Sequence, residues 1–523
     1  MSCFPQLSYL TSELKELIKI DFIAALPTEL SFKILQHLDT VSLCKAAQVS
    51  RKWRSLADDD TCWHHMCEQH IDRKCTKCGW GLPILERQRL KEYKQQKIRE
   101  VNVIGDDDGT NALQADMSQS KKRVAEDDIE AVSLAKRPCS EISQDATLSE
   151  HSERPRSKRR QTRPWKDVYR DRFKVGANWE KGRYHMKAFK AHNNGVMCLQ
   201  FDDQVLATGS YDTTIKIWDI KTGKHKKTLV GHTAGVRTLQ FDGTKLISGS
   251  LDKTVKIWDL RTGECKLTIA NTDGVLSLNF DGDLCVTGSR DHIVKVYNFR
   301  DKSVFALKGH ADWVNHVRLD LASRTIFSAS DDSTCKLWDL DTKQCIRTYK
   351  GHTGPVQQVL PLPADFELEE ESNVDDDDAD AVSTSSLDSI DLIEGARENY
   401  GCGFLNQPLR PCPPRYMLTG SLDNTLRLWD TSTGRTLRKF FGHVEGVWAL
   451  GADSLRVISG AEDRMVKIWD TRTGKCDRTI TGHAGPVSCI GLSDSRMVTG
   501  SEDSEVRIYD FSMEHESTVS SQS

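Results

Sequence analysis

The sequence has 523 residues, of which 38% are hydrophobic and 28% are charged, with a formal net charge of -4 at pH 7. This composition is typical of a soluble chain and excludes a fibrous protein, and no apolar run approaches the roughly 18 residues of a membrane span. The slightly acidic balance argues against direct nucleic-acid binding by the whole chain. The start, MSCFPQLSYLTSELKELIKI, lacks the pattern of a secretory signal, so we expect a reducing compartment and no structural disulfides among the 16 cysteines.

The first 66 residues predict small helices. Residues 7–20, within the segment 1–20, form an amphipathic pattern. Residues 21–66 follow with three predicted short helices, the first of which carries Leu30, Ile34 and Leu38 as an i, i+4, i+8 stripe. So small a helical module barely makes a core alone, which indicates that a partner covers part of its apolar surface.

Two later features of this module complete the helical prediction. Asp39 and Thr40 are good N-caps for the second helix, which has Leu43, Ala46 and Ala47 inward. Trp53, Leu56 and Trp63 supply the hydrophobic set of the third helix.

Residues 67–100 begin with a cluster of cysteine and histidine: Cys67, His70, Cys75 and Cys78. Two ligand pairs, each with two intervening residues, can chelate a tetrahedral zinc ion, although the gap of four residues between them is tight. Neighbouring basic residues would equally favour redox-reactive thiolates. A helix end with neither role is the third interpretation.

Residues 101–162 are rich in charged residues and serine, and we expect them to be disordered. Basic clusters at 121–123, 136–138 and 154–160 favour nuclear import signals over nucleic-acid contacts, because no aromatic residue interleaves them. They predict a nuclear location, alone or with a cytoplasmic one. Residues 163–182 predict a linker helix.

Residues 183–512 contain an internal repeat. Trp-Asp, or a related pair, recurs at Trp218, Trp258, Tyr297, Trp338, Trp429, Trp469 and Tyr509, with spacings of 40, 39, 41, 91, 40 and 40 residues. Gly-His early and Trp-Asp late, with four short β runs between them, are typical of a WD-repeat propeller blade. We therefore predict a seven-bladed propeller behind a small all-helical module, a mixed and mainly β fold.

Three further features refine this propeller. The orphan stretch 184–192 matches the end of a blade, so we expect it to complete the seventh blade and close the ring. The long interval contains an acidic insertion, residues 361–411, between the first two strands of blade five, which we expect to be disordered. Residues 513–523 form a polar tail.

Six of the seven repeats contain a histidine and an aspartate that resemble catalytic residues. The histidines are His192, His232, His310, His352, His443 and His483. We interpret them as members of buried hydrogen-bond networks within the blades. Blade three has Asn271 in place of the histidine, so its network must differ.

The helical module resembles the F-box. The residues that carry this resemblance are Leu26, Pro27, Leu30, Ile34, Leu38, Leu43, Val49, Ser50, Trp53 and Trp63. With seven WD repeats, the chain is similar to F-box/WD-repeat proteins, the substrate receptors of Skp–cullin–F-box ubiquitin ligases. CEQHIDRKCTKCGWGLP and RPWKDVYRDRFKVGANWEKGRY resemble the fungal sulfur-controller, or methionine-repression, members.

The resemblance implies partners and two binding surfaces. The adaptor-binding residues would be Leu26, Pro27, Leu30, Ile34, Leu38, Leu43 and Val49, with cullin and a RING subunit bound through the adaptor. The target would be a transcriptional activator of sulfur-assimilation genes, with the bZIP class as a candidate. Residues 7–20 can dimerise in related receptors, so a homodimer is a further expectation. Neither catalysis nor a membrane partner is expected.

Target binding is expected at the propeller face that carries the Gly-His and Ser-x-Asp loops. Our candidate contacts are Tyr211, Arg237, Arg290, Trp313 and Trp448. Arg237 and Arg290 fall where phosphodegron-reading relatives carry arginines, and a guanidinium suits bidentate contact with phosphate or carboxylate. Asp331, Glu462 and Glu502 oppose an anionic ligand, so the nature of the target stays open. A WD-repeat scaffold that does not act in ubiquitination is the alternative function.

Overall fold

The computed structural model describes residues 21–70 and 164–512, apart from 364–365, 367–396, 398, 402–403, 405–409 and 472. These residues belong to two compact units, one ending at Gln69 and including residues 164–173, and one running from Lys174. The predicted helix at 7–20, the linker 101–162 and the polar tail lie outside the described residues. No helix in the described ranges is long and apolar enough to cross a membrane.

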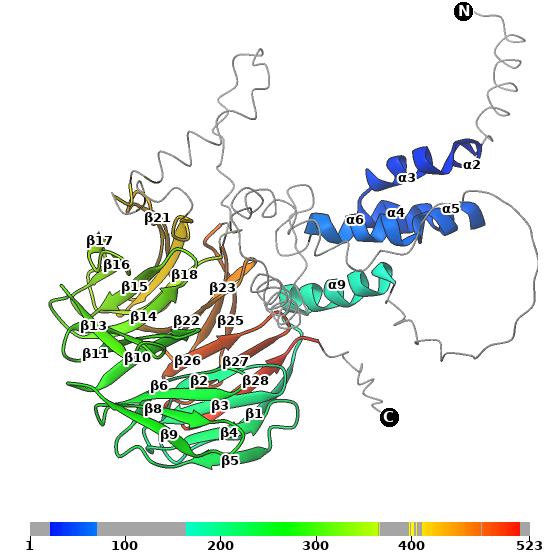
Figure 1. Ribbon diagram of the computed structural model, residues 1–523. Helices are drawn as coiled ribbons and strands as arrows, with labels where there is room; N and C mark the ends of the chain where they lie inside the picture. Colours follow the sequence, from blue (N-terminus) through cyan, green and yellow to red (C-terminus); the bar gives the residue numbers. More distant parts are fainter. Residues whose placement is uncertain are drawn as a thin grey trace, which may run out of the picture. The chain divides into compact units, whose positions relative to one another are not determined.

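The first unit is helical (Figure 1). Its elements are α2 (Phe22–Ala25), α3 (Thr28–Gln36), α4 (Thr40–Ala46), α5 (Arg51–Ala57), α6 (Asp60–His70) and the first half of α9 (Trp165–Lys181). Asp39 caps α4 as predicted, because its carboxylate accepts a hydrogen bond from the N–H of Val41 at 3.2 Å. The predicted third helix is in fact two helices: the Asp59 carboxylate accepts the N–H of Thr61 at 2.9 Å and starts α6 anew.

The core of this unit takes one or more side chains from each helix: Ile23, Leu35, Leu43, Leu56, Trp63 and Met66. Helix α3 turns Ser31 inward beside Leu35, and the Ser31 hydroxyl donates to the carbonyl oxygen of Ile23 at 3.2 Å. Tyr169 of α9 joins this core, with its ring 5.2 Å from that of Trp63 and its hydroxyl 2.7 Å from that of Thr40. Because α3 buries this side, its predicted stripe faces outward.

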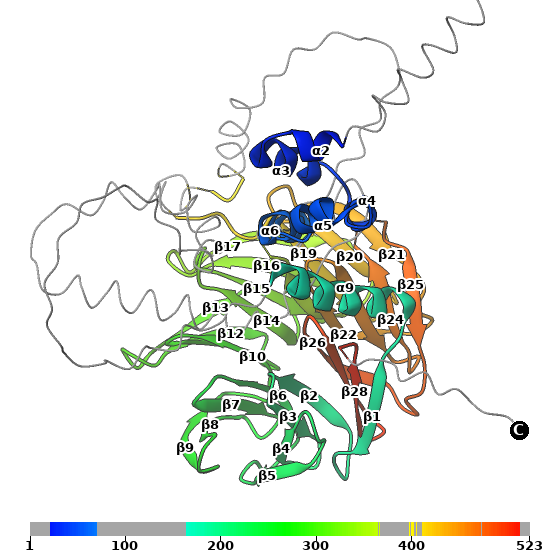
Figure 2. The same ribbon diagram turned by 90° about the vertical axis from the view of Figure 1, so that its right-hand side faces the viewer.

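The second unit is a seven-bladed β-propeller, which confirms the predicted fold class (Figures 1 and 2). Its sheets, in order of blades one to seven, are β2 (Val196–Phe201), β3 (Val205–Ser210), β4 (Ile215–Asp219), β5 (His225–Leu229); β6 (Val236–Phe241), β7 (Lys245–Ser250), β8 (Thr254–Asp259), β9 (Cys265–Ala270); β10 (Val275–Asp281), β11 (Leu284–Ser289), β12 (Ile293–Asn298), β13 (Ser303–Lys308); β14 (Val314–Asp320), β15 (Thr325–Ser330), β16 (Thr334–Asp339), β17 (Cys345–Lys350); β18 (Val356–Pro361), β19 (Tyr416–Ser421), β20 (Leu426–Asp430), β21 (Thr436–Phe440); β22 (Val447–Ala452), β23 (Arg456–Ala461), β24 (Val466–Asp470), β25 (Cys476–Ile480); β26 (Val487–Leu492), β27 (Arg496–Ser501), β28 (Glu505–Asp510), β1 (His185–Lys190).

Ring closure follows the prediction made from the orphan stretch. Strand β1 pairs antiparallel with β28, from His185 opposite Asp510 to Lys190 opposite Glu505 (Figure 2). The first strand of the propeller thus completes its last blade, and an edge of the sheet that would otherwise be unpaired is covered.

The second half of α9 fastens both chain ends of the propeller. The Trp179 ring stacks on Phe511 with ring centroids 3.5 Å apart, and its indole N–H donates to the carbonyl of Asp494 at 3.0 Å. Asn178 donates to the carbonyl of Phe511 at 2.8 Å. The residues just before β1 and just after β28 are therefore held together by side-chain contacts as well as by strand pairing.

The insertion in blade five lies between β18 and β19, as predicted, but its ends are ordered, which corrects our expectation for residues 361–411 as a whole. Phe366 is buried in a cluster with residues of blades five and six. Tyr400 and Phe404 are buried in a cluster with residues of blades four and five. These apolar residues lie in a stretch that is otherwise acidic and of low average hydrophobicity. The sequence therefore predicted disorder for the whole insertion.

Candidate functional site

The recurring histidines and aspartates form hydrogen-bond chains inside the blades. In blade six the Trp469 indole N–H lies 2.7 Å from Ser459 Oγ, which lies 2.7 Å from His443 Nε2, while His443 Nδ1 lies 2.8 Å from Asp463. The histidine-to-aspartate link recurs at His192, His232, His310, His352 and His483. This confirms the structural interpretation of these residues.

A neutral histidine satisfies every polar group in this chain of bonds. An ionised aspartate accepts the Nδ1 proton, so Nε2 is left to accept from the serine or threonine hydroxyl, which in turn accepts the indole N–H. Burial lowers the pKa of His192, His232, His352 and His443, although the adjacent aspartates oppose the shift. Burial alone would raise the pKa of Asp212, but hydrogen bonds from Thr214 and the contact with His192 lower it overall.

We expect the propeller to lose stability as the pH falls below 6.5. The unfolded chain gains protons on these histidines through the ordinary pKa of about 6.5, while the folded state, with its lowered pKa values, does not. Each such histidine can remove up to about 1.4 kcal/mol from the free energy of unfolding per pH unit. Urea unfolding at pH 7.5 and 5.5 should show a lower midpoint at pH 5.5 that recovers on return to pH 7.5. An equal or higher midpoint at pH 5.5 would contradict the neutral histidines.

Blade three has the altered network that its sequence predicts. With Asn271 in place of histidine, Lys295 takes over the contact with the aspartate, because its Nζ lies 3.0 Å from Asp291 and also donates to the Asn271 side chain. A lysine–aspartate ion pair thus replaces the histidine–aspartate bond in this blade.

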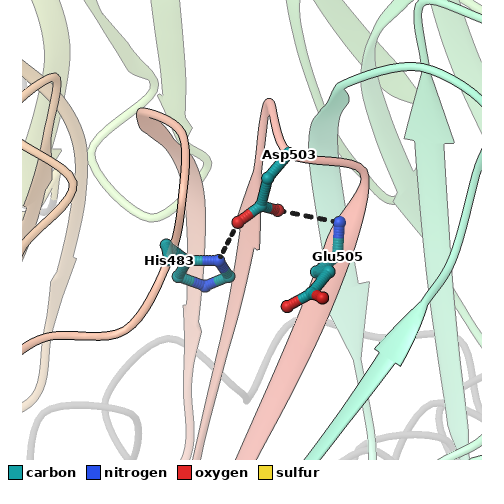
Figure 3. Close-up of side chains that lie close together, drawn as sticks. All are labelled: His483, Asp503 and Glu505. Carbon is teal, nitrogen blue, oxygen red and sulfur yellow. Dashed lines mark hydrogen bonds and ion pairs between the residues drawn. The ribbon is translucent and has the colours of Figure 1, made fainter.

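Blade seven contains a group of three potential cation ligands, His483, Asp503 and Glu505 (Figure 3). Asp503 already accepts hydrogen bonds from His483 at 2.9 Å and from the N–H of Glu505 at 2.8 Å. The Glu505 carboxylate lies 3.2 Å from Arg507. The group is the blade's own network with a glutamate where blades one, two, four and five have threonine, and we assign it no ligand.

The five candidate target contacts lie on one face of the propeller, formed by the loops between blades and the loops after each second strand; we call this the upper face. Two arginine–tryptophan pairs stand on it. The guanidinium of Arg237 lies 5.6 Å from the centre of the Trp448 ring, and that of Arg290 lies 4.5 Å from the Trp313 ring. Tyr211 is 39% exposed beside the loop that leads to Arg237, where a Cβ on Gly235 would meet its ring.

The contact between Arg237 and Trp448 crosses the central channel, because these residues begin β6 of blade two and β22 of blade six, which are not neighbours. Two donors beside the arginine–tryptophan pairs lack an acceptor among the described residues: Nε of Arg290 and Nε1 of Trp448. Both atoms are buried, so the donors left for the acceptor oxygens of a ligand are the terminal guanidinium nitrogens of the half-buried Arg237 and Arg290.

A polar cluster at the same mouth was not among our candidates. Asp331 accepts hydrogen bonds from Asn315 at 2.6 Å and from Gln357 at 3.3 Å, which joins blades four and five. Burial raises the pKa of Asp331. The sequence signal for this cluster was an asparagine and a glutamine at the same position of two successive blades, directly after the valine that begins the first strand.

The helical unit presents an apolar surface made of side chains that its own core does not use. Its most exposed members are Leu30, Ile34, Val41 and Val49, which are 47%, 39%, 61% and 64% exposed; we call them the exposed apolar set. Pro27 is exposed as well, and Leu26 and Leu38 are half-buried. Leu43 is fully buried, which confirms its predicted inward position in the second helix and corrects its assignment as an adaptor contact.

Of the four predicted zinc ligands, the structure describes only the side chain of Cys67. The side chain of His70, and the residues Cys75 and Cys78, lie outside the described residues. Cys67 is fully buried in the core of the helical unit, and burial raises the pKa of its thiol to about 12. Zinc binds the thiolate form and deprotonates the thiol on binding, so the zinc site stays a prediction.

Comparison with known proteins assigns both units. Residues 23–69 match the F-box-like family model. The WD domain, G-beta repeat model matches residues 183–219, 223–259, 263–298, 301–339, 412–430, 434–470 and 474–510. Among solved structures, the WD40 β-propeller domain of Doa1 is similar at 22% identity, with a TM-score of 0.48, over 62% of this chain and 96% of that one.

Curated relatives cover most of the chain. A protein of Emericella nidulans called "Probable E3 ubiquitin ligase complex SCF subunit sconB" is 60% identical over 87% of this chain and 68% of its own length. The protein of the same description from Talaromyces stipitatus is 60% identical over 87% of this chain and 67% of its own length. The chain therefore belongs to the sconB family of F-box/WD-repeat proteins.

Proposed function

We propose that the chain is the non-catalytic substrate receptor of an SCF-type ubiquitin ligase. The observation that carries this proposal is the exposed apolar set of the F-box, whose side chains face away from the core while a separate propeller offers aromatic and cationic groups. The F-box would bind a Skp-type adaptor, and through it cullin and a RING subunit. The propeller would bind the target.

The receptor acts by proximity. A tethered target meets the charged ubiquitin-conjugating enzyme at an effective concentration of about millimolar, so a modest affinity of the upper face is sufficient. The histidines and aspartates that resemble catalytic groups are held in the hydrogen-bond chains of the blades, which supports a role without catalysis.

We further propose that the target is a transcriptional activator of sulfur-assimilation genes, with the bZIP class as a candidate. The printed name of the relatives, sconB, and the sulfur-controller motifs support this. The basic clusters in residues 121–160 support a nuclear location, and the amphipathic pattern of residues 7–20 supports a homodimer.

Affinity purification from sulfur-replete and sulfur-starved cells with the proteasome blocked tests the proposal. The wild-type chain should retain adaptor, cullin and a transcription factor. If adaptor and cullin are absent from the purified material while a nuclear complex is present, the chain is a scaffold outside the ubiquitin system.

A further inference from the structure

Apart from the aspartates of the blade networks and Asp312 and Asp331 of blade four, the charged side chains of the upper face are divided between two arcs of the ring. Blades two and three carry Arg237, Lys253 and Arg290, and blades six and seven carry Glu445, Glu462 and Glu502. Each arc also holds one residue of opposite sign: Asp273, which lies 3.3 Å from Lys253, and the exposed Arg464. The upper face therefore has a cationic side and an acidic side.

The two sides do not neutralise one another within the described residues. Arg237 and Arg290 lie over indole rings and form no ion pair there. Glu462 and Glu502 are exposed and likewise form no ion pair with the described residues. Charges left without an ion-pair partner around the mouth of the channel are available to a ligand, and charge complementarity selects partners.

The two sides are also within reach of one ligand. Since Arg237 crosses the channel to Trp448, a group that binds this guanidinium already touches blade six, the blade of Glu445 and Glu462. Glu502 lies against Gly195 of the neighbouring blade, at the rim of the same mouth. A uniformly anionic segment seated on the arginines would meet these carboxylates as like charges, which costs binding free energy.

We propose that the upper face binds a dipolar target segment, with an oxyanion on Arg237 and Arg290 and a lysine or arginine on Glu462 and Glu502. The guanidinium groups of Arg237 and Arg290 donate to the oxygens of the oxyanion, which is a carboxylate or a phosphate. This inference rests on the proposed function and names the chemistry of the substrate that the same face accepts.

A random library of 12-residue displayed peptides, selected on the full chain in complex with its adaptor, tests the inference. The wild type should enrich peptides that carry Asp or Glu in one half and Lys or Arg in the other. Two charge reversals, Arg237→Glu with Arg290→Glu and Glu462→Lys with Glu502→Lys, are compared with it. Glu264→Lys, an exposed position on the turn at the opposite end of blade two, is the matched control.

The affinity of one enriched peptide should fall at least about 10-fold in each double variant and stay unchanged in Glu264→Lys. Replacing the acidic residue of that peptide by phosphoserine distinguishes a phosphate from a carboxylate. If the wild type instead enriches uniformly acidic peptides, the dipolar inference is wrong and an anion-binding site at this face stands.

Equal binding by all variants, or no charge-patterned peptide enriched by the wild type, would overturn the inference at this face. Adaptor binding by the same preparations is measured separately and decides the proposed function. Failure of the dipolar inference and failure of the proposed receptor function are therefore distinguished by separate measurements.

Discussion

Replacement of Leu30 by aspartate should weaken binding of a purified Skp-type adaptor at least about 100-fold. Leu30 is 47% exposed in the isolated F-box, so an adaptor that covers it removes roughly half of an apolar side chain from water, which is worth about 1 kcal/mol. A carboxylate in the same place is buried without a partner and costs about 2 kcal/mol or more. Together these exceed the 2.7 kcal/mol that corresponds to about 100-fold.

The same substitution should leave the fold intact, because Leu30 points away from the core of its unit. Isothermal titration of the full chain with the adaptor measures the loss, and far-UV circular dichroism checks the fold. Ser55→Asp, an exposed position on α5 outside the exposed apolar set, introduces the same charge and should bind like the wild type. Wild-type affinity in Leu30→Asp would show that α3 does not contact the adaptor.

The propeller could be predicted in detail because its information is local and repeated. A period of about 40 residues fixes the blades, and one strand without a blade at the start must complete the blade that lacks a strand at the end. The altered hydrogen-bond network of blade three could also be predicted, since Asn271 cannot replace a histidine in it. What the pattern does not show is the substitute, Lys295, because the replacement comes from another strand of the blade.

The F-box surface was predicted less completely, for a reason of helix geometry. The sequence predicts Leu43 to point inward, but the family resemblance also implied that it contacts the adaptor; Val41, two residues away in α4, points to a different side of the helix and was not predicted. The structure buries Leu43 and exposes Val41. On the propeller, the arginines and tryptophans were each predicted, but their pairing depends on distances between blades, and for Arg237 and Trp448 across the ring, that no local pattern contains.

The ordered ends of the insertion were missed because their anchors are isolated residues in a polar stretch. Arg410 is the most informative of them. It is 6% exposed, its Nε donates to the carbonyl of Ser323 at 2.8 Å, and its Nη2 donates to the carbonyl of Arg324 at 3.0 Å and to Asp339 at 2.7 Å. A second carboxylate, that of Asp341, lies 3.3 Å from its Nη1. This arginine therefore ties the insertion of blade five to blade four.

Replacement of Arg410 by alanine should lower the free energy of unfolding of the propeller by about 3 to 5 kcal/mol, because it leaves the Asp339 carboxylate buried without its cation. Burial alone would raise the pKa of Asp339, and the hydrogen bond from Arg410 outweighs it and lowers this pKa. Without the arginine, the charged Asp339 carboxylate is still destabilised by burial but no longer has the hydrogen bond and the positive charge that offset this free-energy cost. Urea unfolding followed by tryptophan fluorescence measures the difference.

Arg415→Ala is the matched control. Arg415 also faces an aspartate, Asp430, at 3.7 Å, but its side chain is 62% exposed, so water screens the pair and its loss should cost about 1 kcal/mol or less. The double variant Arg410→Met with Asp339→Asn removes both charges together and should be less destabilised than the sum of the single changes by about 0.5 to 3 kcal/mol. Equal effects of Arg410→Ala and Arg415→Ala would mean that the insertion is not fastened through this buried pair. A large difference between them would mean that an acidic segment of low average hydrophobicity is anchored to the propeller by one cation, whose partners come from the neighbouring blade.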